Sequence, residues 1–257
     1  MGSFWYIIVS VIQISPNFGQ VEMSQFCPSY NFIDVSNLFS LKRKNDFTNS
    51  YLGINVPIKS NQETFSYIKS QRDKFRKCEP EILELYKDES LHFTLGAAVQ
   101  LKKDPNVEKI KEIIEPKKAE ILQIVGEEIS KLRAFKVAAK FTKSTPKSTF
   151  VFVSFEKDME KTIKTFQANI VERVYKILER MGVERYTENK PFGRPVNFAR
   201  WNVDQLPSNT KDFFEQYTKG FTEDINAEGK VTEAVLTYSD QAWSNPKENI
   251  IEKFELK

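Results

Sequence analysis

Histidine and cysteine are scarce in this chain of 257 residues, which has one histidine, His92, and two cysteines, Cys27 and Cys78. The cysteines form no C-x-x-C pair, so a zinc site built from cysteine and histidine is excluded. Two cysteines are also too few for the disulfide scaffold of a small secreted domain. We therefore expect two free thiols in a reducing intracellular compartment, cytoplasm or organelle, and neither a metal ion nor a cofactor.

A strong imbalance of charge is absent as well. The formal net charge is +3, and this small excess does not by itself predict binding to a polyanion. Hydrophobic residues make up 40% and charged residues 28% of the chain, as is ordinary for a soluble globular protein. The length is sufficient for one large domain or two modest lobes with a hydrophobic core.

The hydrophobic run near the N-terminus, from Phe4 to Ile12, lacks the features of a targeting signal. It is too short to span a bilayer, and no basic residues precede it as they would in a signal peptide. Gly2 suggests myristoylation, but Tyr6 stands where that motif has serine or threonine. The run therefore predicts an extra strand or an apolar arm, although a targeting role stays open.

The sequence divides into an N-terminal extension, residues 1–48, and a domain, residues 49–257. The extension consists of the apolar arm, residues 1–22, and a polar leader with little periodicity. We expect the arm to contact a partner protein or a membrane surface if it is retained. The alternative is an upstream extension with the functional start at Met23.

The single histidine belongs to a strand-like segment, Leu91-His92-Phe93-Thr94-Leu95. Side chains alternate between the two faces of a strand, so His92 and Thr94 share one face while the apolar residues are buried on the other. This pair suits a phosphoester, because the hydroxyl can bond a phosphoryl oxygen and the imidazole can transfer a proton. The chemistry normally needs two histidines, one acid and one base, and this chain cannot supply the second.

Hydrophobic periodicity and turn residues predict the remaining elements. We expect strands at 51–58, 91–101, 132–141, 149–155, 196–203, 231–238 and 250–256. We expect helices after Asn61, from Asp104-Pro105 to a break at Pro116, beyond Pro116, from Asp158 to Gly182, and around Phe213. The strands and helices mix without strict alternation, so the fold class is α+β with antiparallel sheets.

The segment 158–182 carries a continuous apolar stripe. Such a stripe occurs on amphipathic helices that bind a partner protein, and also on helices that pack against a sheet. Packing is the favoured interpretation.

The order of these elements, with His92-Phe93-Thr94 and a later strand Leu236-Thr237-Tyr238-Ser239, resembles the 2H phosphoesterase superfamily (LigT-like). Within it, the chain is most similar to the central domain of A-kinase-anchoring-protein type, and the resemblance covers about residues 49–257. It implies two pseudo-symmetric lobes of antiparallel sheet, flanked by helices, around a central cleft. It also implies one H-x-[ST] motif on each lobe and cleavage of cyclic or 2′,5′ phosphodiesters by two histidines.

The second motif departs from the family pattern. A match without gaps over Phe192–Arg200 places Pro195 at the histidine and Asn197 at the hydroxyl residue. Alternation then predicts that Val196 and Phe198 are buried and that Pro195, Asn197 and Ala199 face the cleft. The other register places Asn197 at the histidine and Ala199 at the hydroxyl. Neither register restores a general acid, because proline has no titratable atom.

The resemblance, together with the missing histidine of the second motif, leads to a prediction about function. We expect a non-catalytic 2H-phosphoesterase-like protein, a binding or structural subunit of a larger assembly, that retains nucleotide or phosphate binding through His92, Thr94 and Asn197. The alternative is an RNA or cyclic-nucleotide phosphodiesterase, a phosphoric diester hydrolase, that uses His92 as acid or base with a partner other than histidine. A third possibility is that His92 is only a hydrogen-bonded remnant and Thr94 an ordinary strand residue.

Overall fold

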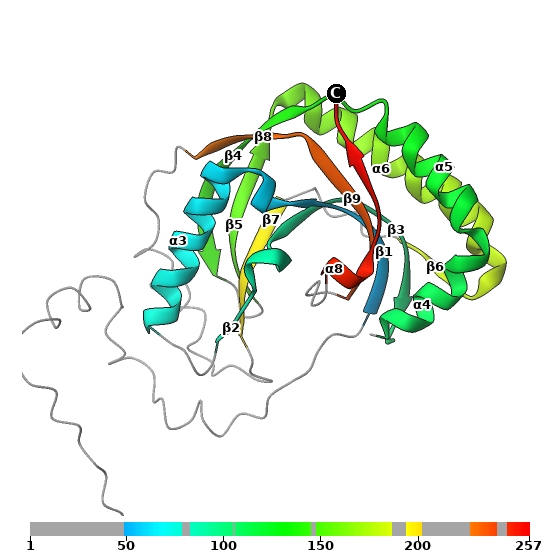
Figure 1. The fold of residues 1–257 in the computed structure, drawn as a ribbon, viewed down its shortest axis with the longest axis horizontal. Helices are drawn as coiled ribbons and strands as arrows, with labels where there is room; N and C mark the ends of the chain where they lie inside the picture. The colour runs from blue at the N-terminus through cyan, green and yellow to red at the C-terminus, as the bar shows by residue number, and fades with distance from the viewer. Residues whose placement is uncertain are drawn as a thin grey trace, which may run out of the picture.

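The structure is a computed structural model that describes residues 49–78, 83–104, 106–144, 148–186, 194–201, 227–240 and 246–257 (Figure 1). The predicted N-terminal extension, the helix around Phe213 and the tip of the hairpin near Pro146 lie outside these residues. Neither cysteine side chain is among those described, so the free thiols stay a prediction.

Two five-stranded antiparallel sheets form the framework, as the predicted α+β class requires. Sheet A has the order β10-β9-β1-β3-β6, and sheet B has the order β2-β7-β5-β4-β8. The strands of sheet A are β1 (Asn49–Pro57), β3 (His92–Lys102), β6 (Glu184–Arg185), β9 (Glu233–Asp240) and β10 (Ile250–Glu255). Those of sheet B are β2 (Leu83–Leu85), β4 (Phe135–Ser144), β5 (Ser148–Phe155), β7 (Arg194–Trp201) and β8 (Glu228–Val231).

The helices and short turns occupy the segments between these strands. The helices are α3 (Gln62–Cys78), α4 (Val107–Ile114), α5 (Lys118–Ile129), α6 (Lys157–Leu178) and α8 (Pro246–Asn249). The 3-10 turns are η1 (Ile58–Ser60), η2 (Asp88–Ser90), η3 (Glu115–Lys117) and η4 (Glu179–Met181). The predicted break at Pro116 is confirmed, since it falls in η3 between α4 and α5. Gly182 ends η4 with a φ of 77°, a conformation that favours glycine.

The predicted helix starts are right in one case and wrong in two. Asn61 caps α3, because its Oδ1 accepts the backbone N–H three residues on at 3.2 Å. Asp158 is not the cap of α6: that position is Glu156, whose side chain makes no capping bond. The helix predicted to open at Asp104 begins later, after Asn106, whose side chain accepts the N–H of the second helical residue.

The strand predicted at 231–238 is confirmed from Glu233 on, but its start is wrong, because the segment belongs to both sheets. Val231 ends β8 in sheet B, and Glu233 begins β9 in sheet A. Thr232 lies between them, and its carbonyl accepts the backbone N–H of Leu256 at 2.8 Å. One residue thus carries the chain from one lobe to the other, without the glycine or proline that would mark a turn in the sequence.

Each sheet is covered by helices on one face. On sheet B, Tyr67 of α3 reaches Thr142 with a hydroxyl-to-hydroxyl distance of 3.5 Å. On sheet A, Gln167 of α6 packs over Gly96, where an added Cβ would lie 3.5 Å from its Cγ. Figure 1 shows α3 on one side of the molecule and α4, α5 and α6 on the opposite side, with the strands between them. We call the face of each sheet that is opposite these covering helices its inner face.

One hydrophobic core extends across both sheets. The ring of Phe155 in β5 lies 5.6 Å from that of Phe93 in β3 and 5.5 Å from that of Phe135 in β4, measured between centroids. The interpretation of the stripe on 158–182 as packing is confirmed, since α6 buries it against the core. Its buried residues are Met159, Ile163, Phe166, Gln167, Ile170, Val171, Val174 and Leu178.

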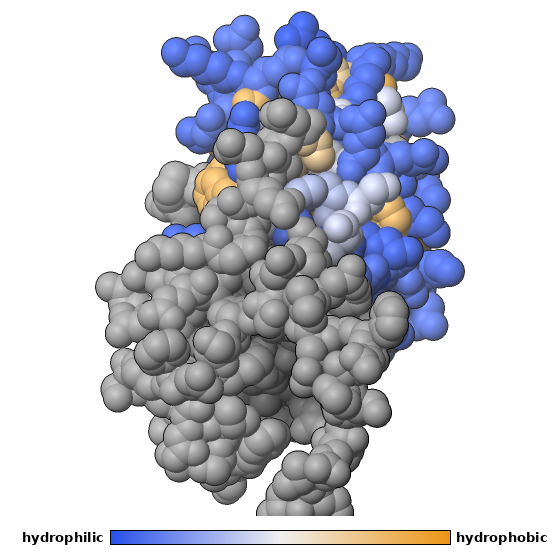
Figure 2. All heavy atoms as spheres, turned by 90° about the vertical axis from the view of Figure 1, so that its left-hand side faces the viewer, coloured by the Kyte–Doolittle hydropathy of each residue, from blue (hydrophilic) through white to orange (hydrophobic). Residues whose placement is uncertain are grey.

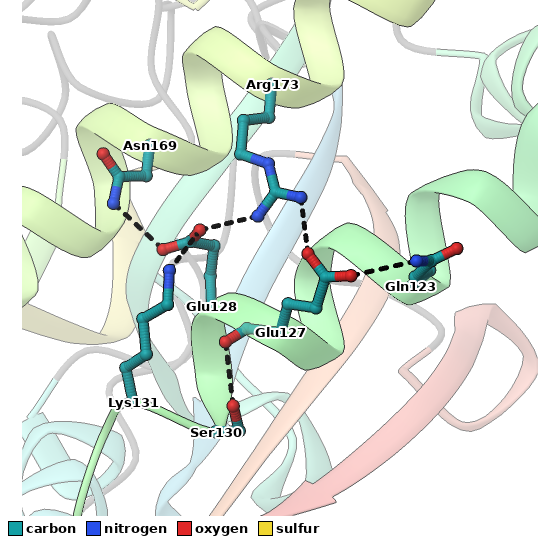
Figure 3. Close-up of polar contacts among 7 residues, drawn as sticks. All are labelled: Gln123, Glu127, Glu128, Ser130, Lys131, Asn169 and Arg173. Atoms are coloured by element: carbon teal, nitrogen blue, oxygen red, sulfur yellow. Dashed lines mark hydrogen bonds and ion pairs between the residues drawn. The ribbon is translucent and has the colours of Figure 1, made fainter.

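A buried carboxylate joins α5 to α6 (Figure 3). Glu128, 2% exposed, accepts hydrogen bonds from Lys131 at 2.7 Å, Asn169 at 3.0 Å and Arg173 at 2.7 Å. Burial alone would raise the pKa of Glu128, but these three bonds outweigh it and hold the pKa below its ordinary value. The hydrogen bonds to Glu128 therefore stabilise the contact between α5 and α6 as long as this carboxylate is ionised.

On the face that Figure 2 draws, the described surface is mainly hydrophilic. Figure 2 shows hydrophobic side chains only as scattered single spots where the coloured surface is visible. Among the described residues, Phe141 is the one large hydrophobic residue classed as exposed, at 40%. Within the same part of the chain no helix is both long and apolar enough to cross a membrane.

Candidate functional site

His92 and Thr94 lie together on the inner face of sheet A. The alternation predicted from the sequence is confirmed: Leu91, Phe93 and Leu95 are buried, whereas His92 and Thr94 are partly exposed. Pro57 of β1 is the strand partner of His92 and marks the same end of the sheet. The first motif therefore presents an imidazole and a hydroxyl side by side.

A bulge ends this alternation directly after the motif. Asn55 of β1 pairs with Thr94 and Ile54 pairs with Gly96, so Leu95 has no partner in the register. The extra residue shifts the parity, and Gly96 comes to lie under α6 instead of on the inner face. The register assigns Tyr51, Asn55, His92, Thr94, Gln100 and Ser239 to the inner face of sheet A.

The hydrogen bond of His92 defines its tautomer. The Nδ1 atom lies 2.8 Å from the backbone carbonyl oxygen of Ser90. A carbonyl oxygen can only accept, so Nδ1 carries the proton, and the lone pair of the neutral imidazole is on Nε2. In this form Nε2 can accept a proton or a hydrogen bond.

Thr94 is held by a residue that the sequence analysis missed. Its hydroxyl donates to Oδ1 of Asn55 at 2.8 Å, and Asn55 is only 2% exposed. The proton expected to reach a phosphoryl oxygen is therefore engaged within the protein, and Thr94 offers only acceptor lone pairs to a ligand. The signal was a polar residue between Ile54 and Val56 in a predicted strand.

The second motif has the register predicted by the match without gaps. Val196 and Phe198 of β7 are fully buried, whereas Pro195 and Asn197 are partly exposed. The expectation that Ala199 also faces the cleft is wrong. Phe150 of β5 pairs with Asn197 but Thr149 pairs with Ala199, so a bulge at Phe198 moves Ala199 to the buried face.

Aromatic side chains line the inner face of sheet B beside this motif. Phe152 pairs with Pro195, Phe150 pairs with Asn197, and Phe141 of β4 pairs with Phe152. The rings of Phe141 and Phe152 are stacked, with centroids 5.1 Å apart and an interplanar angle of 3°. The same register places three exposed lysines on this face, Lys136, Lys143 and Lys230. The sequence analysis missed this group, although the alternation in Phe150-Val151-Phe152-Val153 was a signal for it.

The strands that carry the two motifs are neighbours at the junction of the sheets. β3 and β7 contact each other, and the backbone N–H of Tyr86 donates to the carbonyl of Phe198 at 2.9 Å. The junction thus brings the site residues His92, Thr94 and Asn197 into one region of the molecule. That His92 and Asn197 face one another directly stays a prediction.

Neighbouring residues of the segment Leu236–Ser239 lie on opposite faces of sheet A. Ser239 lies on the inner face, whereas Tyr238 is buried on the helix side, with Nζ of Lys111 5.9 Å from its ring centroid. Burial, and then the carboxylate of Glu115, raise the pKa of Tyr238 to about 12, so its hydroxyl stays protonated. Among the described residues, no group of three or more His, Cys, Asp and Glu residues is placed to hold a metal ion.

The comparisons with known proteins give a class of fold. No family model matches the sequence, and no curated protein matches it either. Among solved structures, the chain is similar to the protein TT0787 of Thermus thermophilus, with a TM-score of 0.51 and 15% identity over 80% of this chain and 97% of that one. It is also similar to E. coli LigT complexed with 3′-AMP, with a TM-score of 0.49 and 14% identity over 81% of this chain and 99% of that one. The similarity to TT0787 shows the fold, two antiparallel sheets with flanking helices, and this is the fold that the resemblance to the 2H phosphoesterases predicted.

Proposed function

We propose that this chain is a non-catalytic protein with the 2H phosphoesterase fold, which binds a phosphate-bearing ligand, a nucleotide or an RNA end, at its inner faces. The observation that carries the proposal is Pro195, which occupies the inner face of β7 opposite Phe152. The family chemistry that the resemblance implies would require an acid or a base at this position.

The loss of one proton-transfer group has a large expected cost. A positioned general acid or base typically contributes about 10²- to 10⁴-fold to a rate. Proline can neither donate nor accept a proton, and the chain has no second histidine. The absence of a second histidine therefore supports a binding role in preference to a catalytic one.

The inner faces offer contacts for the phosphate and for the base of a nucleotide. Nε2 of His92 can donate a hydrogen bond to a phosphoryl oxygen when the imidazole is protonated. The side-chain amide of Asn197 can donate one in its ordinary neutral form. The stacked pair Phe141 and Phe152 is a surface on which a base can stack, and such stacking is worth about 1–3 kcal/mol per base. Exposed lysines such as Lys143 attract phosphate to the same face.

One observation favours the alternative function, an RNA or cyclic-nucleotide phosphodiesterase. His92 has the tautomer that a general base requires, with the lone pair on Nε2. This function needs an acid other than histidine. Arg194 and Arg200 stay protonated and are poor proton donors, so the nearby candidate is Lys190, which lies outside the described residues.

We further propose that the protein is a subunit of a larger assembly in a reducing intracellular compartment, similar to the A-kinase-anchoring-protein type. The apolar arm, residues 1–22, would bind a partner protein or a membrane surface. Deleting these residues should leave the melting temperature of the domain nearly unchanged and abolish association with the native partner. A clear loss of melting temperature would instead show that the arm belongs to the core of the domain.

Binding is tested by titrating the full chain with inorganic phosphate and with AMP, while the NMR signals of the single histidine are followed. Both ligands should shift these signals, and Asn197→Ala should weaken both. Phe141→Ala should weaken AMP alone, since phosphate has no base to stack. Lys164→Ala, an exposed change on α6, is the control and should alter neither titration. Unperturbed His92 signals at saturating concentrations of both ligands would contradict the proposed site.

A further inference from the structure

Arg72, a buried arginine of α3, binds the segment 86–91, which we call the turn and which directly precedes β3 with its motif His92-Phe93-Thr94. Only 5% of the Arg72 side chain is exposed. Its Nη1 donates to the backbone carbonyl of Tyr86 at 3.0 Å and lies 2.5 Å from Oδ1 of Asp88. A charge this buried is stable only with such partners, because the guanidinium group has lost its water. Arg72 therefore fixes the segment of Tyr86 and Asp88 relative to α3.

The same turn is bonded to both sheets. The N–H of Tyr86 donates to Phe198 of β7 at 2.9 Å, and the carbonyl of Leu91 accepts the N–H of Ile58, which directly follows β1, at 3.0 Å. Within the turn, the N–H of Ser90 donates to Lys87 at 3.0 Å. The turn thus joins α3, sheet A and sheet B at the place where the two motif strands meet.

The end of this turn supplies the acceptor for His92. The carbonyl of Ser90 lies 2.8 Å from Nδ1, and this contact selects the Nδ1-protonated tautomer. An imidazole in water prefers the other tautomer slightly, so the contact must be maintained by its surroundings. A small displacement of the turn would remove the acceptor from Nδ1.

We propose that Arg72 is a positioning residue for His92. By holding the backbone at Tyr86 and the carboxylate of Asp88, it keeps the Ser90 carbonyl against Nδ1 and so keeps the lone pair of the imidazole on Nε2. The inference deepens the proposed function and rests on it, since Nε2 is the atom that would donate to a phosphoryl oxygen once it has taken up a proton. The tautomer itself is a property of the ligand-free chain.

The charges around the turn agree with this role. Lys69 of α3 also lies 3.7 Å from Asp88, and Asp73 lies 3.5 Å from Arg72. Burial alone would raise the pKa of Asp88, but Arg72 and then Lys69 outweigh it and hold this pKa below its ordinary value. Nε of Arg72 is buried without a hydrogen-bond partner among the described residues. An incompletely satisfied guanidinium in the interior is costly, so the bonds of Arg72 to Tyr86 and Asp88 must offset this cost.

The experiment is ¹⁵N NMR of the ligand-free full chain at a pH where His92 is neutral. Because the chain has one histidine, the imidazole signals need no assignment. The wild type should show the Nδ1-protonated tautomer as the major form. In Arg72→Ala the Nε2-protonated tautomer should become the major form. Arg72→Lys should be intermediate, because lysine can pair with Asp88 but cannot bond two acceptors with a planar fork.

Two further variants separate positioning from folding. Asp88→Asn removes the charge partner at a half-exposed position, so it tests the same connection if Arg72→Ala fails to fold. Arg173→Ala breaks the comparable network between α5 and α6 and should leave the tautomer unchanged. An unchanged tautomer in both Arg72→Ala and Asp88→Asn, or an Nε2-protonated wild type, would overturn the inference. Failure of phosphate to bind any variant would overturn only the proposed function.

Discussion

The hydroxyl of Thr94 donates to Oδ1 of Asn55 at 2.8 Å, and this bond couples β3 to β1 within the first motif. Thr94→Val should lower the free energy of unfolding by about 1–3 kcal/mol, because Oδ1 of the buried Asn55 loses its donor. A double-mutant cycle with Asn55→Ala, measured by urea unfolding, should give a coupling of about 1 kcal/mol.

The control for this cycle is Thr165→Val on the surface of α6, where the hydroxyl donates to the carbonyl of Lys161. That group is exposed, so water can replace the lost bond, and the change should stay within about 0.5 kcal/mol. Additive effects of Thr94→Val and Asn55→Ala would show that the bond does not contribute to stability.

The register of the second motif predicts different costs for two phenylalanines. Phe198 is fully buried, so Phe198→Ala should lower the free energy of unfolding by about 3–5 kcal/mol. Phe141 is 40% exposed and stacks on Phe152, so Phe141→Ala should cost about 1 kcal/mol or less. Chemical unfolding of both variants measures the difference. Equal costs would contradict the assignment of Phe198 to the core and of Phe141 to the inner face.

The Glu128 network predicts a loss of stability in acid. The pKa of Glu128 is held below its ordinary value of 4.5, so its contribution is present above about pH 4.5 and is lost as the pH falls through the folded-state pKa. In Glu128→Gln, stability should be about 1–3 kcal/mol lower near pH 7 and should decrease less steeply below about pH 4.5.

The neighbouring carboxylate is the matched control. Glu127 also binds Arg173, but it is exposed, so Glu127→Gln should cost less than about 1 kcal/mol at neutral pH. Urea unfolding of both variants and the wild type between about pH 7 and pH 3 gives the comparison. A Glu128→Gln curve parallel to that of the wild type would exclude this carboxylate as the titrating group.

Alanine substitutions at two glycines should change the stability of the protein in opposite directions. A Cβ on Gly229 of β8 would lie 1.6 Å from Nδ2 of Asn61, the residue that caps α3. Gly229→Ala should therefore destabilise the protein by at least about 1–3 kcal/mol, because the cap must move. In α5, a Cβ on Gly126 would meet only Phe254 at 3.7 Å, so Gly126→Ala should stabilise the protein by about 0.5–1 kcal/mol. Thermal unfolding distinguishes the two, and a tolerated Gly229→Ala would contradict the contact between α3 and β8.

Local patterns predicted the elements and the burial in both motifs, but not every strand register. Alternation around His92 and Phe198 holds as long as the strand is regular. It fails at the bulge after Leu95 and at the bulge that removes Ala199 from the inner face, because a bulge depends on the partner strand. The change from one sheet to the other at Thr232 was equally hidden, since no glycine or proline marks it in the sequence.

The residues that support His92 could not be predicted from the sequence. Asn55 and Arg72 lie 37 and 20 positions before His92, and only the fold brings them to the motif and to its preceding turn. Their partners are the hydroxyl of Thr94, the backbone carbonyl of Tyr86 and the carboxylate of Asp88, and no local pattern in the sequence connects either residue to these distant partners. The presence of one histidine and the proline in the second motif, in contrast, were evident from the sequence and remain the basis of the functional proposal.

The most direct test of this proposal is an assay of the full chain on 2′,3′-cyclic nucleotides and on 2′,5′-linked oligomers, beside His92→Ala. With Pro195 in place of a second proton-transfer group, we expect no product above the blank from either protein. Product formation well above the blank in the wild type that disappears in His92→Ala would contradict the account and favour the phosphodiesterase.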